Sequence, residues 1–245
     1  MISIFLLILS FFEKFGGIMF KRLLLITVFL ISFSPAFPQN LQIHYDFGDN
    51  REYITTTLEQ FKPDSYGSTF FFVDFNHSIK GVTEAYWEIS RDLKFWEFPV
   101  AAHFEYNGGF NTAIQFNNCY LVGASYFWNS PDFTKGFTLQ AMYKHIERNE
   151  EQHNFQLTGV WYWHLFDGKL TFSGFADFWR EKHYVSKDNF QTHIKKSNFV
   201  FISEPQIWYN INKTFSVGSE VELSNDFAGM SGFKVNPTVA VKYNF

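Results

Sequence analysis

Residues 234–245 read KVNPTVAVKYNF, with an apolar or aromatic side chain at every second place. The apolar set ends on Phe245, and polar side chains such as Asn236 and Lys242 stand between its members. Successive side chains of a β-strand point to opposite faces, so this pattern predicts a strand with one apolar and one polar face. Such a strand fits a wall that separates lipid from water.

The same alternation recurs along the chain. In Val100–Tyr106 the apolar positions alternate with His103 and Glu105, and Phe155–Trp163 repeats the pattern. After residue 40 no apolar run approaches the roughly 20 residues of a membrane-spanning helix. The sequence therefore predicts an all-β fold, a transmembrane antiparallel β-barrel of about twelve strands. The candidate strands are 41–47, 53–62, 68–76, 82–95, 98–107, 119–128, 136–147, 154–165, 169–181, 197–210, 213–225 and 234–245, with the faces of 53–62 and 119–128 unassigned.

The composition fits a protein that contacts lipid on one face of its strands and water on the other. Aromatic residues make up 22% of the sequence, yet its mean hydropathy is −0.14, so apolar and polar residues must alternate. Lipid on one side and water on the other accommodate that mixture. The net charge of −4 provides no basic field for nucleic acid, and the single cysteine, Cys119, excludes an internal disulfide framework. No cofactor is expected.

The N-terminus reads as an export signal. Residues 19–36 contain the basic pair Lys21 and Arg22, an apolar run, and the small residues Ser34 and Ala36 at cleavage spacing. We predict that residues 1–36 are an N-terminal extension and signal peptide whose true start is Met19, and that 37–245 is the barrel. A helical hairpin anchor is the competing interpretation, but the apolar run is too short to span a membrane.

Connections and the last residue indicate how the barrel is placed and assembled. Phe166–Gly168 and Asn210–Asn212 are tight turns, whereas 182–196 and 226–233 are longer. Outer-membrane barrels have short periplasmic turns and longer extracellular loops, so we expect a Gram-negative outer membrane with the tight turns periplasmic. The terminal Phe245 resembles the signal read by the barrel-assembly machinery, which is therefore an expected partner, together with outer-membrane lipid. A β-sandwich that happens to end in phenylalanine is the alternative.

With the strands placed, the mature chain resembles the nucleoside-specific (Tsx) family of outer-membrane channels. The matching stretches are Ser173–Trp179 after a tight Asp-Gly turn, the aromatic strand Phe70–Phe75 with its acid, and the closing Lys242–Phe245. The order of elements matches from about Ile43 to the end. The resemblance implies a twelve-stranded barrel with a narrow pore, lined by aromatic and ionisable residues, that admits nucleosides.

If the apolar set faces lipid, the alternate set lines the lumen and is rich in acids. A narrow, low-dielectric tube focuses their field, which disfavours anions relative to cations and neutral solutes. Lumen aromatics would offer faces on which a nucleobase stacks. The function predicted is a channel for small solutes, nucleosides among them. The candidate lumen and solute-contact residues are Asp74, Glu88, His103, Glu105, Phe175, Asp177, Trp179, Glu204, Glu220 and Glu222.

Two other functions are compatible with the sequence. Lumen charges can simply pair across strands, so a structural or adhesive barrel with a plugged lumen is the main alternative. An outer-membrane lipid hydrolase is the second, although the adjacent His77 and Ser78 point to opposite faces of a strand. His44 and Asp46 share a face, but two ligands are too few for a zinc site. No catalytic or metal-ligating residue is predicted.

Overall fold

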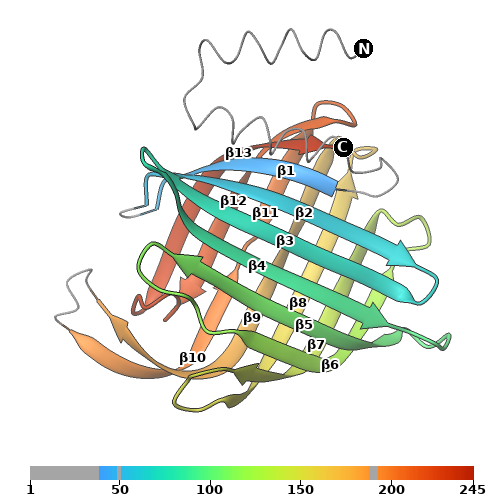
Figure 1. Cartoon of the computed structure of the whole chain (residues 1–245). Helices are drawn as coiled ribbons and strands as arrows, with labels where there is room; N and C mark the ends of the chain where they lie inside the picture. Colours follow the sequence, from blue (N-terminus) through green and yellow to red (C-terminus); the bar gives the residue numbers. More distant parts are fainter. Residues whose placement is uncertain (1–38, 49–50, 188–192) are drawn as a thin grey trace, which may run out of the picture. The chain divides into compact units, whose positions relative to one another are not determined.

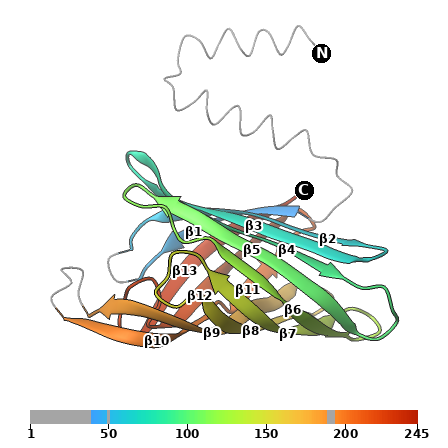
Figure 2. The ribbon, with the colours of Figure 1, turned by 60° about the horizontal axis from the view of Figure 1, so that its bottom comes forward.

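Thirteen antiparallel β-strands make up one sheet in the part of the chain that the structure, a computed structural model, describes: residues 39–48, 51–187 and 193–245. The strands are β1 (Gln39–Asp46), β2 (Ile54–Asp64), β3 (Gly67–Ser78), β4 (Gly81–Leu93), β5 (Val100–Asn111), β6 (Cys119–Asn129), β7 (Lys135–Ile146), β8 (His153–Leu165), β9 (Leu170–Ser186), β10 (Ile194–Ser203), β11 (Gln206–Asn210), β12 (Phe215–Asn225) and β13 (Phe233–Asn244). Because β13 pairs with both β12 and β1, the sheet closes into a barrel (Figures 1 and 2).

The thirteen strands occupy twelve positions around the barrel, because β10 and β11 together make up one of them. β10 and β11 both pair with β9 on one side and β12 on the other, and only Glu204 and Pro205 interrupt them. Proline has no N–H to donate to a ladder, so it breaks the strand there. Gly174 on β9 lies opposite this break with φ of +153°, and a Cβ on it would meet the Glu204 carbonyl oxygen at 2.5 Å. The predicted fold class is thus confirmed, including a single spanning strand over 197–210.

The closing strand lies where the sequence pattern places it. Tyr243 in β13 is the register partner of Leu41 in β1 and of Phe215 in β12. Its ring packs edge-on against Phe215 and Phe245, with ring centroids 5.1 and 5.0 Å apart. Where the sheet is closed, each strand has a neighbour on both sides, which is the condition for spanning a membrane with strands. The first part of β10, from Ile194 to Val200, pairs with β9 alone and extends past β12.

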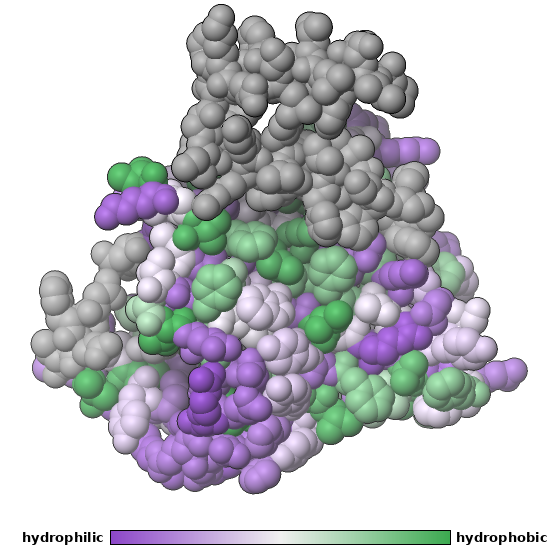
Figure 3. Space-filling model, viewed as in Figure 1, coloured by the Kyte–Doolittle hydropathy of each residue, from purple (hydrophilic) through white to green (hydrophobic). Residues whose placement is uncertain are grey.

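The two faces of the barrel have opposite chemistry. Outward side chains such as Leu139 and Val239 are each 54% exposed, whereas the inward Gln42 and Ser216 are each 2% exposed. Figure 3 shows green apolar side chains spread over the face in view, with the largest group of purple polar side chains at its lower edge. Water does not solvate so large an apolar surface, so lipid must cover it. This surface and the fold place the protein in the outer membrane.

Connection lengths follow the prediction in the second half of the barrel only. Residues 166–169 and 211–214 are short connections, and 187–193 and 226–232 are longer. In the first half, β3 and β4 are joined only by Ile79 and Lys80, on the end where longer loops were expected. Gly81 has φ of +113°, a conformation open to glycine, and this makes the two-residue hairpin possible. The predicted alternation of lengths is therefore wrong for the first half.

The predicted signal peptide, with its start at Met19, lies outside the described residues and stays a prediction. The unit that contains the barrel begins at Pro38. Among the described residues, no helix is long and apolar enough to cross a membrane.

Candidate functional site

The strand register shows which side chains face the lumen. Gln42, His103 and Ser125 are buried polar residues on the inner face, 2%, 0% and 0% exposed, and their register partners share that face. Thr57 pairs with Gln42 and with Asp74, which assigns the inner face of β2 and β3. All ten predicted lumen residues lie on the inner face or, for Glu204, at the β10–β11 break. They are Asp74, Glu88, His103, Glu105, Phe175, Asp177, Trp179, Glu204, Glu220 and Glu222.

The lumen acids differ in exposure. Asp74, Glu88, Asp177, Glu204 and Glu220 are all half-buried, although Asp177 Oδ1 itself is enclosed. None of these five forms a salt bridge within the described residues. They are the carboxylates available to a solute.

The lumen acids fall into two groups, and the members of each group lie within electrostatic reach of one another. The charge of Glu88 on β4 interacts with those of Glu105 on β5 and Asp177 on β9. Glu204 interacts in the same way with Glu220 on β12 and with Asp74 on β3. Like charges held together in a medium of low dielectric constant repel strongly, so a cation that enters the lumen relieves this repulsion.

Two lysines in the lumen are held against tryptophan rings. The Lys144 ammonium lies 4.2 Å from the centroid of the Trp179 ring and donates to Gln156 Oε1 at 2.7 Å. The Lys242 ammonium lies 3.9 Å from the centroid of the Trp208 ring. An ammonium over an aromatic face is attracted by the ring quadrupole, so these contacts fix both charges to the wall.

Trp179 has little ring surface left for a solute. Lys144 covers one face, Phe227 packs against its edge at 6.1 Å and 86°, and the residue is only 8% exposed. Phe175, on the same face of β9, packs against the cluster that contains Trp179 but is only half-buried. Base stacking thus suits Phe175 better than Trp179.

His103 is enclosed by polar partners. Its Nδ1 lies 2.9 Å from Asp92, its Nε2 lies 3.1 Å from Glu105, and Ser125 Oγ donates to Asp92 at 2.7 Å. Ser125 had no predicted role, because the face of 119–128 was ambiguous. The three residue types of a hydrolase triad meet here, and Ser125 Oγ also lies 3.2 Å from His103 Nδ1, but Ser125 and His103 are fully buried and the hydroxyl donates to Asp92. This network joins β4, β5 and β6 and is no lipase site.

Glu222 is fully engaged in a latch. It accepts hydrogen bonds from Arg51 at 2.7 Å, Ser224 at 2.7 Å and Asn236 at 3.0 Å, and Arg51 also lies 3.2 Å from Asp46. Burial opposes the charge of Arg51, but the carboxylates outweigh it and raise the pKa of Arg51 above its ordinary value. Arg51 lies in a connection, where alternation carries no signal, so the sequence did not reveal it.

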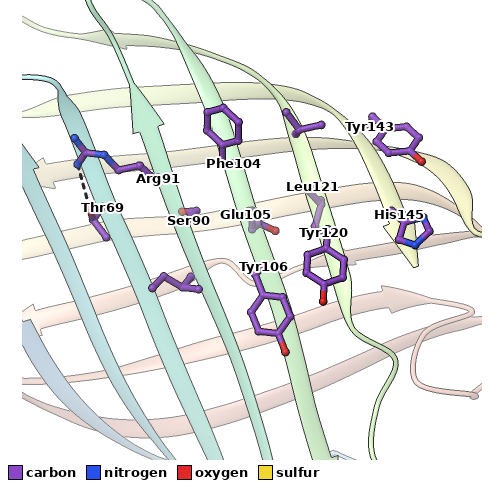
Figure 4. Close-up of a pocket in the computed structure, with 12 residues that line it drawn as sticks. Thr69, Ser90, Arg91, Phe104, Glu105, Tyr106, Tyr120, Leu121, Tyr143 and His145 are labelled. Atoms are coloured by element: carbon purple, nitrogen blue, oxygen red, sulfur yellow. Dashed lines mark hydrogen bonds between the residues drawn. The ribbon is translucent and has the colours of Figure 1, made fainter. Parts of the chain in front are cut away.

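Two hollows open on the barrel, one polar and one apolar. The polar hollow, of about 470 Å³, lies at the tight-turn end and is lined by the inward Ser216 and Lys242 together with Lys169 and Lys213 of the turns. The apolar hollow, of about 550 Å³, lies mainly among outward side chains of β3 to β7. Figure 4 shows the Tyr106 and Tyr120 rings side by side in it. We call the first hollow the vestibule, because it lies at the tight-turn mouth of the barrel, whereas the second faces lipid.

Comparison with solved structures supports the fold. A structure described as KdgM porin matches with a TM-score of 0.50 and 13% identity, covering 85% of this chain and 99% of that one. A NanC porin structure matches with a TM-score of 0.57 and 10% identity, covering 84% of this chain and 100% of that one. At these identities the likeness extends to the barrel fold and not to a solute. No curated protein sequence matches the chain.

One family model matches the whole barrel, from residue 38 to residue 245. Its match begins next to the first strand and ends on the terminal Phe245, so it contains every wall and every lumen residue described above. The chain belongs to this family, which is described as a domain of unknown function, DUF5020.

Proposed function

We propose that this protein is an outer-membrane channel for small solutes whose lumen favours neutral and cationic solutes over anions. The observation that carries the proposal is the set of half-buried lumen carboxylates, Asp74, Glu88, Asp177, Glu204 and Glu220, that form no salt bridge among the described residues. Their field, confined by a low-dielectric wall, raises the local concentration of cations and lowers that of anions.

The barrel geometry supports passage. The vestibule at the tight-turn end is lined by Ser216 and Lys242, which are also lumen residues. Half-buried acids on β3, β4, β9 and β12 place polar side chains along the inner face beyond this mouth. Two barrels of similar fold are described as porins, which favours a channel over an enzyme.

Nucleosides are the finer candidate within this class. The half-buried rings of Phe72, Tyr86 and Phe175 stand on the same lumen face as Asp74, Glu88 and Asp177. A base stacked on one ring would gain about 1–3 kcal/mol, while ribose hydroxyls donate to the carboxylates. Contacts of this strength still let the solute leave, as conduction requires. The resemblance to nucleoside-specific channels in the aromatic strand Phe70–Phe75 supports the same choice.

A plugged structural barrel is the second candidate. Phe227, in the connection between β12 and β13, packs on the inward Trp179, Val200 and Ile202, so this connection covers part of one mouth. Side chains also fill the lumen around His103, since His103 and Ser125 are both fully buried. A barrel plugged in this way carries no current.

A planar-bilayer recording separates these functions. With a KCl gradient across the bilayer, we expect small, cation-selective conductance that added nucleoside reduces reversibly. Glu220→Gln should reduce the selectivity because it removes a half-buried, unpaired charge, whereas Glu222→Gln should leave it unchanged because that charge is engaged in the latch. Both variants must first show the heat-modifiable gel mobility of a folded barrel. Absence of conductance contradicts the channel, and conductance indifferent to every nucleoside contradicts the finer proposal alone.

A further inference from the structure

Four buried acceptors on the inner face of the described strands have no donor, and one of them is Asn154 Oδ1 on β8. The other three, Glu105 Oε1, Asn107 Oδ1 and Asp177 Oδ1, are likewise enclosed and form no hydrogen bond in the structure. The Glu105 side chain is only 9% exposed and Asn107 only 3%. Most buried polar atoms in proteins are paired, and an unpaired one costs about 1–3 kcal/mol. An acceptor set of this kind is explained if a ligand supplies the donors.

The last three acceptors belong to one region of the lumen. Asn107 is the register partner of Glu88, and Glu105 lies two residues away on the same face of β5. The Glu88 charge interacts with those of Glu105 and Asp177, which places the β9 carboxylate within electrostatic reach of the β4–β5 pair. Three strands therefore bring acceptors, and two of the unpaired atoms are carboxylate oxygens.

The chemistry of the set selects its ligand. A hydroxyl brings one donor but also lone pairs that need donors, whereas a primary ammonium has three donors and no acceptor. The ammonium also brings a positive charge, which makes its hydrogen bonds to carboxylates charge-assisted. It therefore fits a site whose unpaired buried atoms are all acceptors.

The protein already holds one ammonium group beside this region. The Lys144 ammonium lies 4.2 Å from the Trp179 ring centroid, and its charge interacts with those of Glu88 and Asp177. Lys144 reaches Gln156 instead of the unpaired oxygens, so it does not satisfy them. A solute ammonium would bind next to Lys144, and the positive charge of Lys144 would weaken that binding.

We propose that Glu88, Glu105, Asn107 and Asp177 form a binding site, the amine station, for the primary ammonium group of a cationic solute. The Lys144 ammonium lowers the affinity of the amine station, because its positive charge repels the ammonium group of the solute. The proposal rests on the proposed function in naming a cationic amine as a solute class of this lumen. It adds the position at which such a solute pauses.

The test is calorimetric titration of the purified full-length barrel in detergent with n-butylammonium chloride, with 1-butanol as the neutral probe of similar size. We expect millimolar binding of the ammonium and none of the alcohol. Asp177→Asn should weaken binding by about tenfold or more, because a charge-assisted hydrogen bond is lost. Lys144→Met should tighten it by removing the competing charge. Glu222→Gln is the matched control, since that carboxylate is saturated, and it should leave the affinity unchanged.

The outcomes separate this inference from the channel. Equal binding of butanol and butylammonium, or an ammonium affinity that neither Asp177→Asn nor Lys144→Met changes, contradicts the amine station. Because titration needs no current, a barrel that binds butylammonium but conducts nothing overturns the channel and keeps the station. A cation-selective channel without ammonium binding does the reverse.

Discussion

Arg51→Met tests how the barrel is closed. Arg51 lies in the connection between β1 and β2, and its main partner Glu222 lies on β12. In the sheet, β13 lies between β12 and β1. The guanidinium is 2.7 Å from Glu222 and 3.2 Å from Asp46 at the end of β1. The latch therefore bridges the seam at which the first and last strands of the barrel meet. Methionine keeps much of the side-chain volume and removes the charge.

The expected cost follows from the burial of the partners. The side chains of Glu222 and Asp46 are 9% and 8% exposed, and removing one member of a buried pair costs about 3–5 kcal/mol. Arg51 is 26% exposed, so solvent screens part of the interaction. Glu222 also keeps hydrogen bonds from Ser224 and Asn236. We therefore expect Arg51→Met to lower the free energy of unfolding by about 2–3 kcal/mol.

Urea unfolding of the barrel in lipid vesicles, followed by tryptophan fluorescence, measures this cost. A cycle with Glu222→Gln should give a double variant that is less destabilised than the sum of the singles, by about 1–2 kcal/mol. Arg91→Met is the matched control, because Arg91 makes a bidentate pair with Asp64, whose side chain is 38% exposed. Exposed pairs contribute about 0–1 kcal/mol. If Arg51→Met costs no more than Arg91→Met, or if the costs of the cycle simply add, the latch does not hold the seam.

Three further predictions concern a mouth, a loop and assembly. Phe227→Ala should raise single-channel conductance, because it removes the ring that packs on Trp179 at one mouth; unchanged conductance means that this connection does not obstruct passage. Hydrogen bonds from lysines hold the pKa of Glu150 below its ordinary 4.5, so their stabilisation is present above pH 4.5 and lost as the pH falls through the lowered pKa. Hydrogen-exchange protection of residues 147–152 should therefore decrease in acid and in high salt, and protection independent of both contradicts the ion pairs. Deleting Phe245 should slow membrane assembly in pulse-chase gels, since the assembly machinery is proposed to read this residue, and a normal assembly rate rules that role out.

The walls of the barrel were predictable because their signal is local. A period of two in the side chains is forced on every strand with lipid on one face and water on the other. In 234–245 each apolar residue of the alternating set faces outward, as the pattern predicts. The pattern was ambiguous in 53–62, where three threonines follow one another, and in 119–128, where the apolar Leu121 faces inward. Pairing with the neighbouring strands assigns the inner face of both segments. The sequence of one strand does not reveal how that strand pairs with its neighbours.

Connections were less predictable because their length depends on one or two backbone positions. Gly81 alone permits the two-residue turn that replaces a longer loop between β3 and β4. The roles of Arg51 and Phe227 were not predictable for the same reason, because both residues lie in connections and reach the lumen region from there. A side chain in a connection has no alternating neighbours, so nothing in the local pattern indicates where it points.

Glu220 and Glu222 show why the inner face was predictable and the state of each charge was not. The two acids are neighbours on one face of β12, and local sequence treats them alike. Glu222 meets Arg51, which lies 171 residues away in the chain, whereas Glu220 forms no salt bridge among the described residues and stays half-buried. Only the closure of the barrel brings that arginine to one carboxylate and not the other. The selectivity of the lumen therefore depends less on the number of its acids than on which of them long-range contacts leave unpaired.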